Sequence, residues 1–330
     1  MKTSASNMFT MSRRKALSMG AAGLIAAVGL AGCGRGGSSQ PAGSAAGAGS
    51  EKDSTVAINA AAYDKLIASG AVADAASIEA NAWAKRIHDA GKIRLGEVHT
   101  STLFSLLDEK DGKLRGFDAG ISQLLTRYIL GDESKHEGTQ VTSDTRESVL
   151  QNDQVDAVFA TYSITDDRKK VISFAGPYYE TQQAILVLKD ENGISGVDDL
   201  AGKKVAVQSG STGPALMEKL VPEAKLQEFK TDEEARSALM QKRVDAYVID
   251  RNMHLGSMIK QPGKYKLVGE AFGPVDPYGI GLPLNSDGVT FVNDFLRKIE
   301  EDGTWEELWK ICIGERADVH EVPVPPAIGA

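Results

Sequence analysis

A ten-residue pattern that occurs twice constrains the fold of this chain more than any other feature. Residues 148–157 read SVLQNDQVDA, and residues 237–246 read SALMQKRVDA. Each copy has the pattern of a helix end, a tight turn and the start of a buried strand. The repeat therefore predicts two α/β lobes built to one plan, each of which presents a strand end to a shared cleft.

Strand and helix patterns alternate from residue 92 to about residue 280, which favours the α/β class. We expect strands at residues 182–188 and 273–282 to cross between the lobes. Helices within residues 289–314 would then complete the first lobe, with the second lobe inserted in it. The expected division is lobe 1 at residues 92–183 and 277–318 and lobe 2 at residues 184–276.

The start of the chain has the order of features of an export signal. The basic cluster Ser12-Arg13-Arg14-Lys15 precedes an uncharged run that ends in Leu30-Ala31-Gly32-Cys33. The run is short for a membrane span and fits the apolar region of a signal peptide. Its last four residues resemble the bacterial lipobox, which implies lipidation of Cys33 and a stable membrane anchor. The two arginines also resemble a twin-arginine signal, so that route and the general route both stay open.

The segments outside the lobes differ in composition. If Cys33 carries the lipid, the second cysteine, Cys312, has no disulfide partner, and we expect it to be a small buried core residue. We expect two short helices, broken near Gly70, in the Ala-rich segment. The expected segments are a signal peptide at 1–33, a Gly/Ser/Ala-rich flexible tether at 34–54, an Ala-rich helical segment at 55–91 and a Pro-rich tail at 319–330.

The formal net charge of −8 and the absence of a dense Lys/Arg stripe argue against nucleic acid as a partner. The loop Ser209-Gly210-Ser211-Thr212 follows a strand pattern and precedes a helix pattern, which is the arrangement of an anion-binding cradle. It lacks the lysine of a phosphate-binding P-loop. Many α/β turns share this pattern without binding anything. We expect no cofactor and no metal ion.

Polar side chains follow the strand of the first repeat. Thr161, Ser163 and Arg168 come directly after it, where ligands bind in open α/β sheets. Arginine presents a planar fork to both oxygens of a carboxylate, and hydroxyl groups complete such a shell. The alternative is an ordinary helix start with Thr165 as its N-cap, and both interpretations can hold together.

In the second repeat, Asp250 lies at the position equivalent to Thr161. Its carboxylate could pair with an ammonium group, or it could be a helix cap or turn residue. These groups together form a recognition set for an α-amino acid. Arg168, Ser163, Ser211 and Thr212 would surround the carboxylate, with Asp250 and Thr161 near the ammonium group.

Residues 92–314 resemble a known family, the family 3 extracellular solute-binding proteins of bacterial amino-acid ABC importers. Two segments of this range are most similar to the glutamate-binding lipoproteins of actinobacteria, namely Ala160-Thr161-Tyr162-Ser163-Ile164 and Phe174-Ala175-Gly176-Pro177. The motifs that carry the resemblance are Gly116-Phe117-Asp118, Ser163-Ile164-Thr165 with Arg168, Phe174-Ala175-Gly176-Pro177-Tyr178-Tyr179, the 209–212 loop, Val244-Asp245-Ala246 with Asp250, Pro277-Tyr278-Gly279-Ile280 and Gly303-Thr304-Trp305.

The resemblance implies a type II periplasmic-binding-protein fold, with the ligand cleft between the lobes and the two crossing strands as the hinge. It implies that Arg168, Ser163 and Thr212 hold the ligand α-carboxylate, while Asp250 and Thr161 receive the α-ammonium. In members that bind acidic amino acids, an arginine at the position of Arg146 meets the side-chain carboxylate; many members with other ligands carry it too. His99 could contact the ligand side chain or be an ordinary loop histidine.

The resemblance further implies a monomer anchored to the outer face of the cell membrane, which binds glutamate or a related amino acid and delivers it to an ABC permease. Family members often carry an aromatic residue and a proline after the first strand. Here that stretch is EVHTSTLF at residues 97–104, without proline or tyrosine, which bears on the ligand assignment. Two alternatives remain: a dehydratase-like enzyme of the same fold, with His99 or Glu97 as the general base, or a sensor that signals to a membrane kinase.

Overall fold

The computed structural model describes residues 57–329 of the chain. The predicted signal peptide, the lipobox Cys33 and the predicted tether lie outside the described residues. Among the described helices, none is long and apolar enough to cross a membrane.

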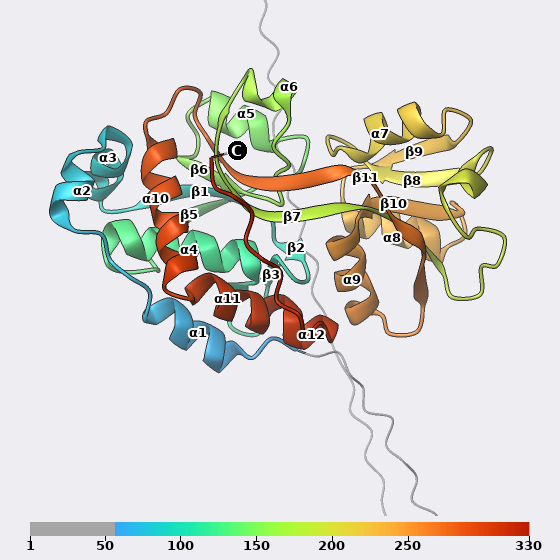
Figure 1. Cartoon of the computed structure of the whole chain (residues 1–330), viewed down its shortest axis with the longest axis horizontal. Helices are drawn as coiled ribbons and strands as arrows, with labels where there is room; N and C mark the ends of the chain where they lie inside the picture. Colours follow the sequence, from blue (N-terminus) through green and yellow to red (C-terminus); the bar gives the residue numbers. More distant parts are fainter. Residues whose placement is uncertain (1–56, 330) are drawn as a thin grey trace, which may run out of the picture. The chain divides into compact units, whose positions relative to one another are not determined.

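An eight-stranded mixed sheet runs through the described part of the chain (Figure 1). Neighbours are parallel at both ends of the sheet and antiparallel in its middle, where β7 and β11 pair. The strands in order across the sheet are β5 (His136–Gln140), β1 (Ile93–Glu97), β6 (Ala157–Phe159), β11 (Tyr265–Leu282), β7 (Ser173–Leu188), β10 (Ala246–Asp250), β8 (Lys204–Gln208) and β9 (Lys225–Phe229).

Strands β7 and β11 join two lobes (Figure 1). They have 16 and 18 residues, well beyond the usual length of about 5–6 residues, and they contain the two crossing strands expected from the sequence. We call the half that contains β5, β1 and β6 lobe 1, and the half that contains β10, β8 and β9 lobe 2. Each lobe has its own apolar clusters on the sheet, so the two-lobe α/β expectation is confirmed.

The helices pack on the sheet within each lobe (Figure 1). A small sheet of β2 (Thr100–Ser101), β3 (Ser105–Leu107) and β4 (Leu114–Arg115) lies in lobe 1. The lobe 1 helices are α4 (Phe117–Leu130), α5 (Arg146–Gln151), α6 (Asp166–Lys169), α10 (Gly288–Glu301), α11 (Thr304–Trp309), the π-helix η2 (Lys310–Gly314) and α12 (Glu315–Ala317). The lobe 2 helices are the 3-10 helix η1 (Val197–Leu200), α7 (Gly213–Leu220), α8 (Asp232–Met240) and α9 (Arg251–Lys260).

The two copies of the sequence repeat adopt the same local structure. Asp153 and Lys242, the sixth residues of the copies, both have positive φ, at 53° and 57°. Each ends a helix in the left-handed conformation that such turns use. Three residues on, the carboxylates of Asp156 and Asp245 each accept a 2.8 Å hydrogen bond from a backbone N–H at the start of a neighbouring strand, that of Arg94 in β1 and that of Lys204 in β8. The internal repeat is therefore confirmed in structure.

Three helices, not the two expected from the sequence, precede the first strand: α1 (Ala60–Ala68), α2 (Ala75–Glu79) and α3 (Ala82–Ala90). A polar residue caps the start of each of the last two helices: Asp74 accepts a hydrogen bond from α2, and Asn81 accepts one from α3. Tyr63 and Trp83 of this segment are buried in the core of lobe 1. The segment is thus part of lobe 1 packing. Cys312 is fully buried in the same core, as predicted.

Candidate ligand-binding site

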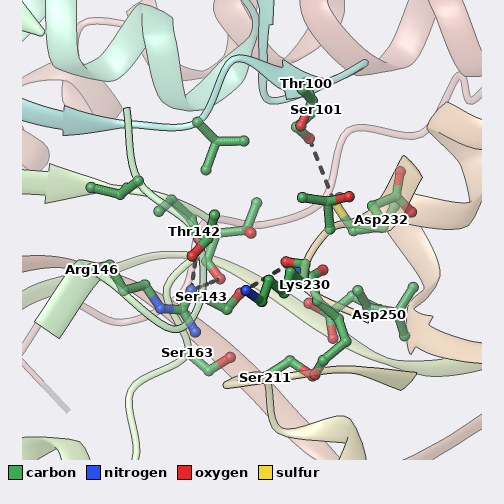
Figure 2. A pocket seen from close by; sticks show the side chains of 18 of the residues that line it. Thr100, Ser101, Thr142, Ser143, Arg146, Ser163, Ser211, Lys230, Asp232 and Asp250 are labelled. Carbon is green, nitrogen blue, oxygen red and sulfur yellow. Dashed lines mark hydrogen bonds between the residues drawn. The ribbon is translucent and has the colours of Figure 1, made fainter. Parts of the chain in front are cut away.

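A cavity of about 70 Å³ lies between the lobes, near the carboxyl ends of β6, β8 and β10 (Figure 2). This is the place where open α/β sheets bind ligands. The predicted site residues that line it are Arg146, Thr161, Ser163, Ser211, Thr212 and Asp250.

Arg168, on the four-residue helix α6, is a predicted site residue that does not line this cavity, although it donates a hydrogen bond to the backbone of the lining residue Ser163. Thr165 caps that helix through its hydroxyl, as the sequence pattern predicted. The Arg168 side chain is buried, and its guanidinium donates 2.8 Å hydrogen bonds to the carbonyl oxygens of Ser163 and Gly210. The Glu147 carboxylate lies 3.6 Å from its Nε. A guanidinium has five N–H donors, so the two terminal nitrogens still have capacity for a further acceptor.

Arg146 begins helix α5 and is only 2% exposed. Its guanidinium donates to the carbonyl oxygens of Ala160 at 2.9 Å and Gly210 at 3.3 Å, and lies 4.0 Å from the centre of the Tyr162 ring. Its Nε–H has no hydrogen-bond partner among the described residues. Burial, reinforced by the charge of Arg168, lowers the pKa of Arg146 to about 10. The site therefore contains a buried cation with an unused donor.

Asp250 ends strand β10 and is 7% exposed. Its carboxylate accepts hydrogen bonds from the Tyr278 hydroxyl and the Gln183 side-chain amide, and it makes no capping bond to helix α9. Asp250 therefore occupies the N-cap position of α9, as the alternative had it, but its side chain is turned to Tyr278 and Gln183 instead of capping the helix. Burial, together with the nearby carboxylate of Asp276, raises the pKa of Asp250 to about 7. This carboxylate would gain from a positively charged partner.

Thr161 has a left-handed backbone, with φ of 43°, and its N–H donates a 2.7 Å hydrogen bond to Asp118. Asp118, in the first turn of α4, also accepts a 2.7 Å hydrogen bond from Tyr178, and burial raises its pKa to about 6. Asp118 lines the cavity but was not among the predicted site residues. The motif Gly116-Phe117-Asp118 could have indicated this residue, because it places a carboxylate in the first turn of a helix that begins after a glycine.

The loop between β8 and α7 supplies the hydroxyl groups of lobe 2. Thr212 donates a 2.7 Å hydrogen bond to Asp276, and Ser211 donates one of 2.7 Å to the carbonyl oxygen of Gln208. Both residues line the cavity, and these hydrogen bonds hold their side chains in place. The loop thus fixes two hydroxyl groups at the cavity, and Figure 2 shows the Ser211 side chain close to that of Ser163.

Direct hydrogen bonds join the two lobes around the cavity. The Ser209 hydroxyl donates to Asp144 at 2.7 Å, and the Gln208 amide donates to Ser143 at 3.3 Å. Gly210 has φ of 68°, and a Cβ there would collide with the backbone of Ser143. A glycine is thus needed at this approach of the two lobes, because other residues would be both strained and blocked.

The structure does not bring His99 to this cavity. His99 and Glu97 line a second cavity in lobe 1. Further residues that line the ligand cavity, none of them predicted from the sequence, include Gln140, Thr142, Ser143, Gln208, Lys230 and Met253. They come from both lobes, with Gln140 and Gln208 at the ends of β5 and β8, Met253 in α9 and the others on loops, and no local pattern in the sequence marked them. Across residues 57–329, no group of three or more His, Cys, Asp or Glu side chains is placed to hold a metal ion.

The family model of the bacterial extracellular solute-binding proteins, family 3, matches residues 93–314. The chain belongs to this family. It is 36% identical over 231 residues to the ABC transporter glutamine-binding protein GlnH of Bacillus subtilis, covering 69% of this chain and 84% of that protein. It is 31% identical over 248 residues to the glutamate-binding protein GluB of Corynebacterium glutamicum, covering 71% and 84%.

Among solved structures, an ancestral arginine-binding protein bound to glutamine is 35% identical to this family member, with a TM-score of 0.62. The match covers 68% of this chain and 98% of that chain. The mixed sheet and the two joined lobes are those of the type II periplasmic-binding-protein fold. The resemblance found in the sequence and the fold that it implied are therefore both confirmed.

Proposed function

We propose that this protein binds a free α-amino acid, glutamate or glutamine, between its lobes and delivers it to an ABC permease. The main observation behind this proposal is the arrangement of charged side chains at the cavity. On the lobe 1 side, the buried guanidinium of Arg146 lines the cavity, and the buried guanidinium of Arg168 bonds to the backbone of the lining residue Ser163. On the lobe 2 side, the buried carboxylate of Asp250 lines the cavity. An amino acid supplies the complementary pair of charges.

The α-carboxylate is assigned to Arg168, with hydroxyl groups from Ser163 and Thr212, where the Thr212 O–H would turn from Asp276 to the ligand. The spare donors of Arg168 support this assignment, since a carboxylate can accept two parallel N–H bonds from one guanidinium. The α-ammonium is assigned to Asp250 and to the region of Thr161. A positive ligand group would offset the burial cost that raises the pKa of Asp250. Ser211 completes the lobe 2 side of the cavity.

The ligand side chain is assigned to the part of the cavity near Arg146. Its unused Nε–H supports a glutamate ligand, because a carboxylate would pair with the charge and accept that donor. Glutamine is the second candidate. The neutral polar groups of Gln140, Thr142 and Ser143 around the cavity favour it, as does the similarity to the glutamine-binding protein of Bacillus subtilis. His99 has no role in this assignment, since it lines the other cavity.

Lobe closure is the proposed route from binding to transport. A ligand held by both lobes stabilises the closed arrangement by its differential affinity for that state. The hydrogen bonds from Ser209 to Asp144 and from Gln208 to Ser143 support a closed state in which the lobes touch. The permease would recognise this closed form.

We further propose that the mature protein is a monomer, attached to the outer face of the membrane through a lipidated Cys33, with residues 34–54 as a tether. The export signal in the sequence supports this location. The boundaries proposed for the lobes are those given by the sequence patterns, with residues 57–91 added to lobe 1 because apolar side chains of this segment lie in its core.

We propose no catalytic step. The two candidates for a general base, His99 and Glu97, line a different cavity from the proposed amino-acid site, which counts against the dehydratase-like alternative. A sensor that signals to a membrane kinase would use the same ligand site. Deleting the gene and measuring uptake of radiolabelled glutamate and glutamine separates the two roles: transport requires loss of uptake, whereas a sensor would leave basal uptake intact.

A further inference from the structure

A second cavity, of about 370 Å³, lies in lobe 1 and is separate from the amino-acid site. This volume falls within the usual range for small-molecule pockets, about 300–1,000 Å³. Val98 lines the first cavity, whereas its neighbours Glu97 and His99 line the second, because successive side chains of an extended chain point to opposite sides. The cavity lies between helix α1, the β3–β4 hairpin, α4 and β5, and α1 precedes the region that matches the family model.

The Glu97 carboxylate is the main charged group within this cavity. Glu97 is 3% exposed, and its carboxylate occupies the space that a Cβ at Gly138 would fill. Within residues 57–329, no lysine or arginine forms an ion pair with it, and the Ser122 hydroxyl is its hydrogen-bond partner. Burial raises the pKa of Glu97, although the charge of His136 and the Ser122 hydroxyl act in the opposite direction.

The other carboxylates of this cavity already have cationic partners. Asp64 of α1 pairs with Arg115 at 2.9 Å, and Glu133 pairs with Arg127 at 3.2 Å. Lys113, the lysine that lines the cavity, lies 3.2 Å from Asp64. When His136 is neutral, the buried Glu97 carboxylate has no cationic partner among the described residues, which is costly, so a bound cation would stabilise Glu97 in its ionised form.

His136 supplies a second acceptor. Its Nδ1 lies 3.0 Å from the carbonyl oxygen of Glu133, and a carbonyl oxygen can only accept, so Nδ1 is the donor in this bond. In the neutral ring, Nε2 is then left as an acceptor. The apolar side chains of Ile67, Leu107 and Leu114 form other parts of the lining. The cavity thus combines a carboxylate and an imidazole acceptor with an apolar wall.

We propose that this cavity binds a small primary amine, whose ammonium group pairs with Glu97 and whose alkyl chain lies against Ile67, Leu107 and Leu114. A primary ammonium has three N–H donors, which suit the Glu97 carboxylate and the Nε2 of His136. A metal ion is disfavoured, because the described residues place no group of three ligating side chains together. This site goes beyond the proposed amino-acid binding and does not depend on it.

The test is calorimetric titration of the full chain with n-butylamine, at a pH near 8 at which the amine is protonated, and with n-butanol as a neutral analogue of the same length. Saturable binding of n-butylamine, at least about tenfold tighter than that of n-butanol, is expected. Glu97→Gln should weaken n-butylamine binding by at least about tenfold, while Glu228→Gln, an exposed glutamate of β9, should leave it unchanged.

A second variant covers the case in which Glu97→Gln does not fold. Leu107 is 37% exposed, so Leu107→Trp can be accommodated at the surface while filling part of the cavity, and it should also weaken n-butylamine binding. Binding of glutamate or glutamine should persist in both folded variants. No saturable n-butylamine binding, binding that is equal in Glu97→Gln and Glu228→Gln, or displacement of n-butylamine by glutamate would overturn the proposal.

Discussion

The guanidinium of Arg168 donates a 2.8 Å hydrogen bond to the carbonyl oxygen of Gly210, and this bond joins the two lobes. Arg146 donates to the same carbonyl oxygen at 3.3 Å. The arginines proposed to bind the ligand are therefore also the residues that connect lobe 1 to the glycine loop of lobe 2. Ligand recognition and lobe closure are thus proposed to use the same side chains.

Arg168→Ala should weaken ligand binding by about 3 kcal/mol or more, about a hundredfold, because the ligand carboxylate would lose its charged partner inside the cleft. Calorimetric titration with the best ligand measures this change. Arg297→Ala is the matched control, since Arg297 is an exposed arginine that pairs with Asp294. An affinity for Arg168→Ala within about threefold of the unmodified protein would contradict the assignment of the α-carboxylate.

Arg146→Gln tests which end of the ligand lies near Arg146. A glutamate side chain would lose an ion pair, whereas a glutamine side chain would lose at most a hydrogen bond, so glutamate affinity should fall by at least about tenfold more than glutamine affinity. Titrations with both ligands against both proteins complete the comparison. Equal losses for the two amino acids would assign Arg146 a structural role instead.

Ligand affinity should depend on pH through Asp250, whose pKa is raised to about 7 by burial and by Asp276. The ligand ammonium pairs with the ionised carboxylate, so binding must remove the proton that Asp250 carries at lower pH. Affinity should therefore be highest above about pH 7 and fall by up to about tenfold for each pH unit below it. Asp118, with a pKa raised to about 6, lies beside the same cavity and titrates below Asp250.

The variant Asp250→Asn distinguishes the effect of Asp250 on the pH dependence from that of Asp118. The variant should bind the ligand weakly, and its remaining affinity should no longer change between about pH 8 and pH 6.5, where Asp250 accounts for most of the titration. Titrations across this range with both proteins provide the measurement. A pH dependence that persists unchanged in Asp250→Asn would show that another group controls it.

Asp287→Ala should detach the start of helix α3 from lobe 1. The Asp287 carboxylate accepts hydrogen bonds from the backbone N–H groups of Ala82 at 2.7 Å and Trp83 at 3.2 Å. Loss of this cap should cost about 1–2 kcal/mol, or about 2–5 °C in Tm for a domain of this size. Asp294→Ala, an exposed position on helix α10, is the control. An unchanged Tm for Asp287→Ala would mean that α3 contributes little to the stability of lobe 1.

Cys33→Ser tests the proposed lipid anchor. The protein should move from the membrane fraction to the soluble fraction, because the lipid is proposed to be attached to the sulfur of Cys33. Fractionation followed by immunoblotting detects the shift, and Cys312→Ser, a change at a buried core position, controls for the loss of a cysteine as such. Equal amounts of Cys33→Ser and unmodified protein in the membrane fraction would rule out anchoring through Cys33.

Local patterns in the sequence predicted much of the fold. The helix ends at Asp153 and Lys242 follow from short-range turn chemistry, and so does the cap at Thr165. The third N-terminal helix was missed because it depends on two polar caps, Asp74 and Asn81, within an Ala-rich stretch that reads as continuous helix. Strong intrinsic helix propensity hides such breaks.

The residues around the site were harder to predict where their place depends on distant contacts. Gln183 and Tyr278 lie on different crossing strands, yet both donate to Asp250. Their meeting is set by the antiparallel pairing of β7 and β11, which no local pattern reveals. His99 shows the opposite failure. Its place after the first strand suggested the ligand site, but the alternation of side chains around Val98 directs it to the second cavity.

The most direct test of the proposed function is a binding screen of residues 52–330, the compact unit that holds the described residues, against each of the common amino acids. Thermal shift detects any ligand that binds the folded state, and calorimetry then gives the affinity. The account predicts binding of glutamate or glutamine at least about tenfold tighter than that of any other amino acid. Absence of binding by every common amino acid would contradict it.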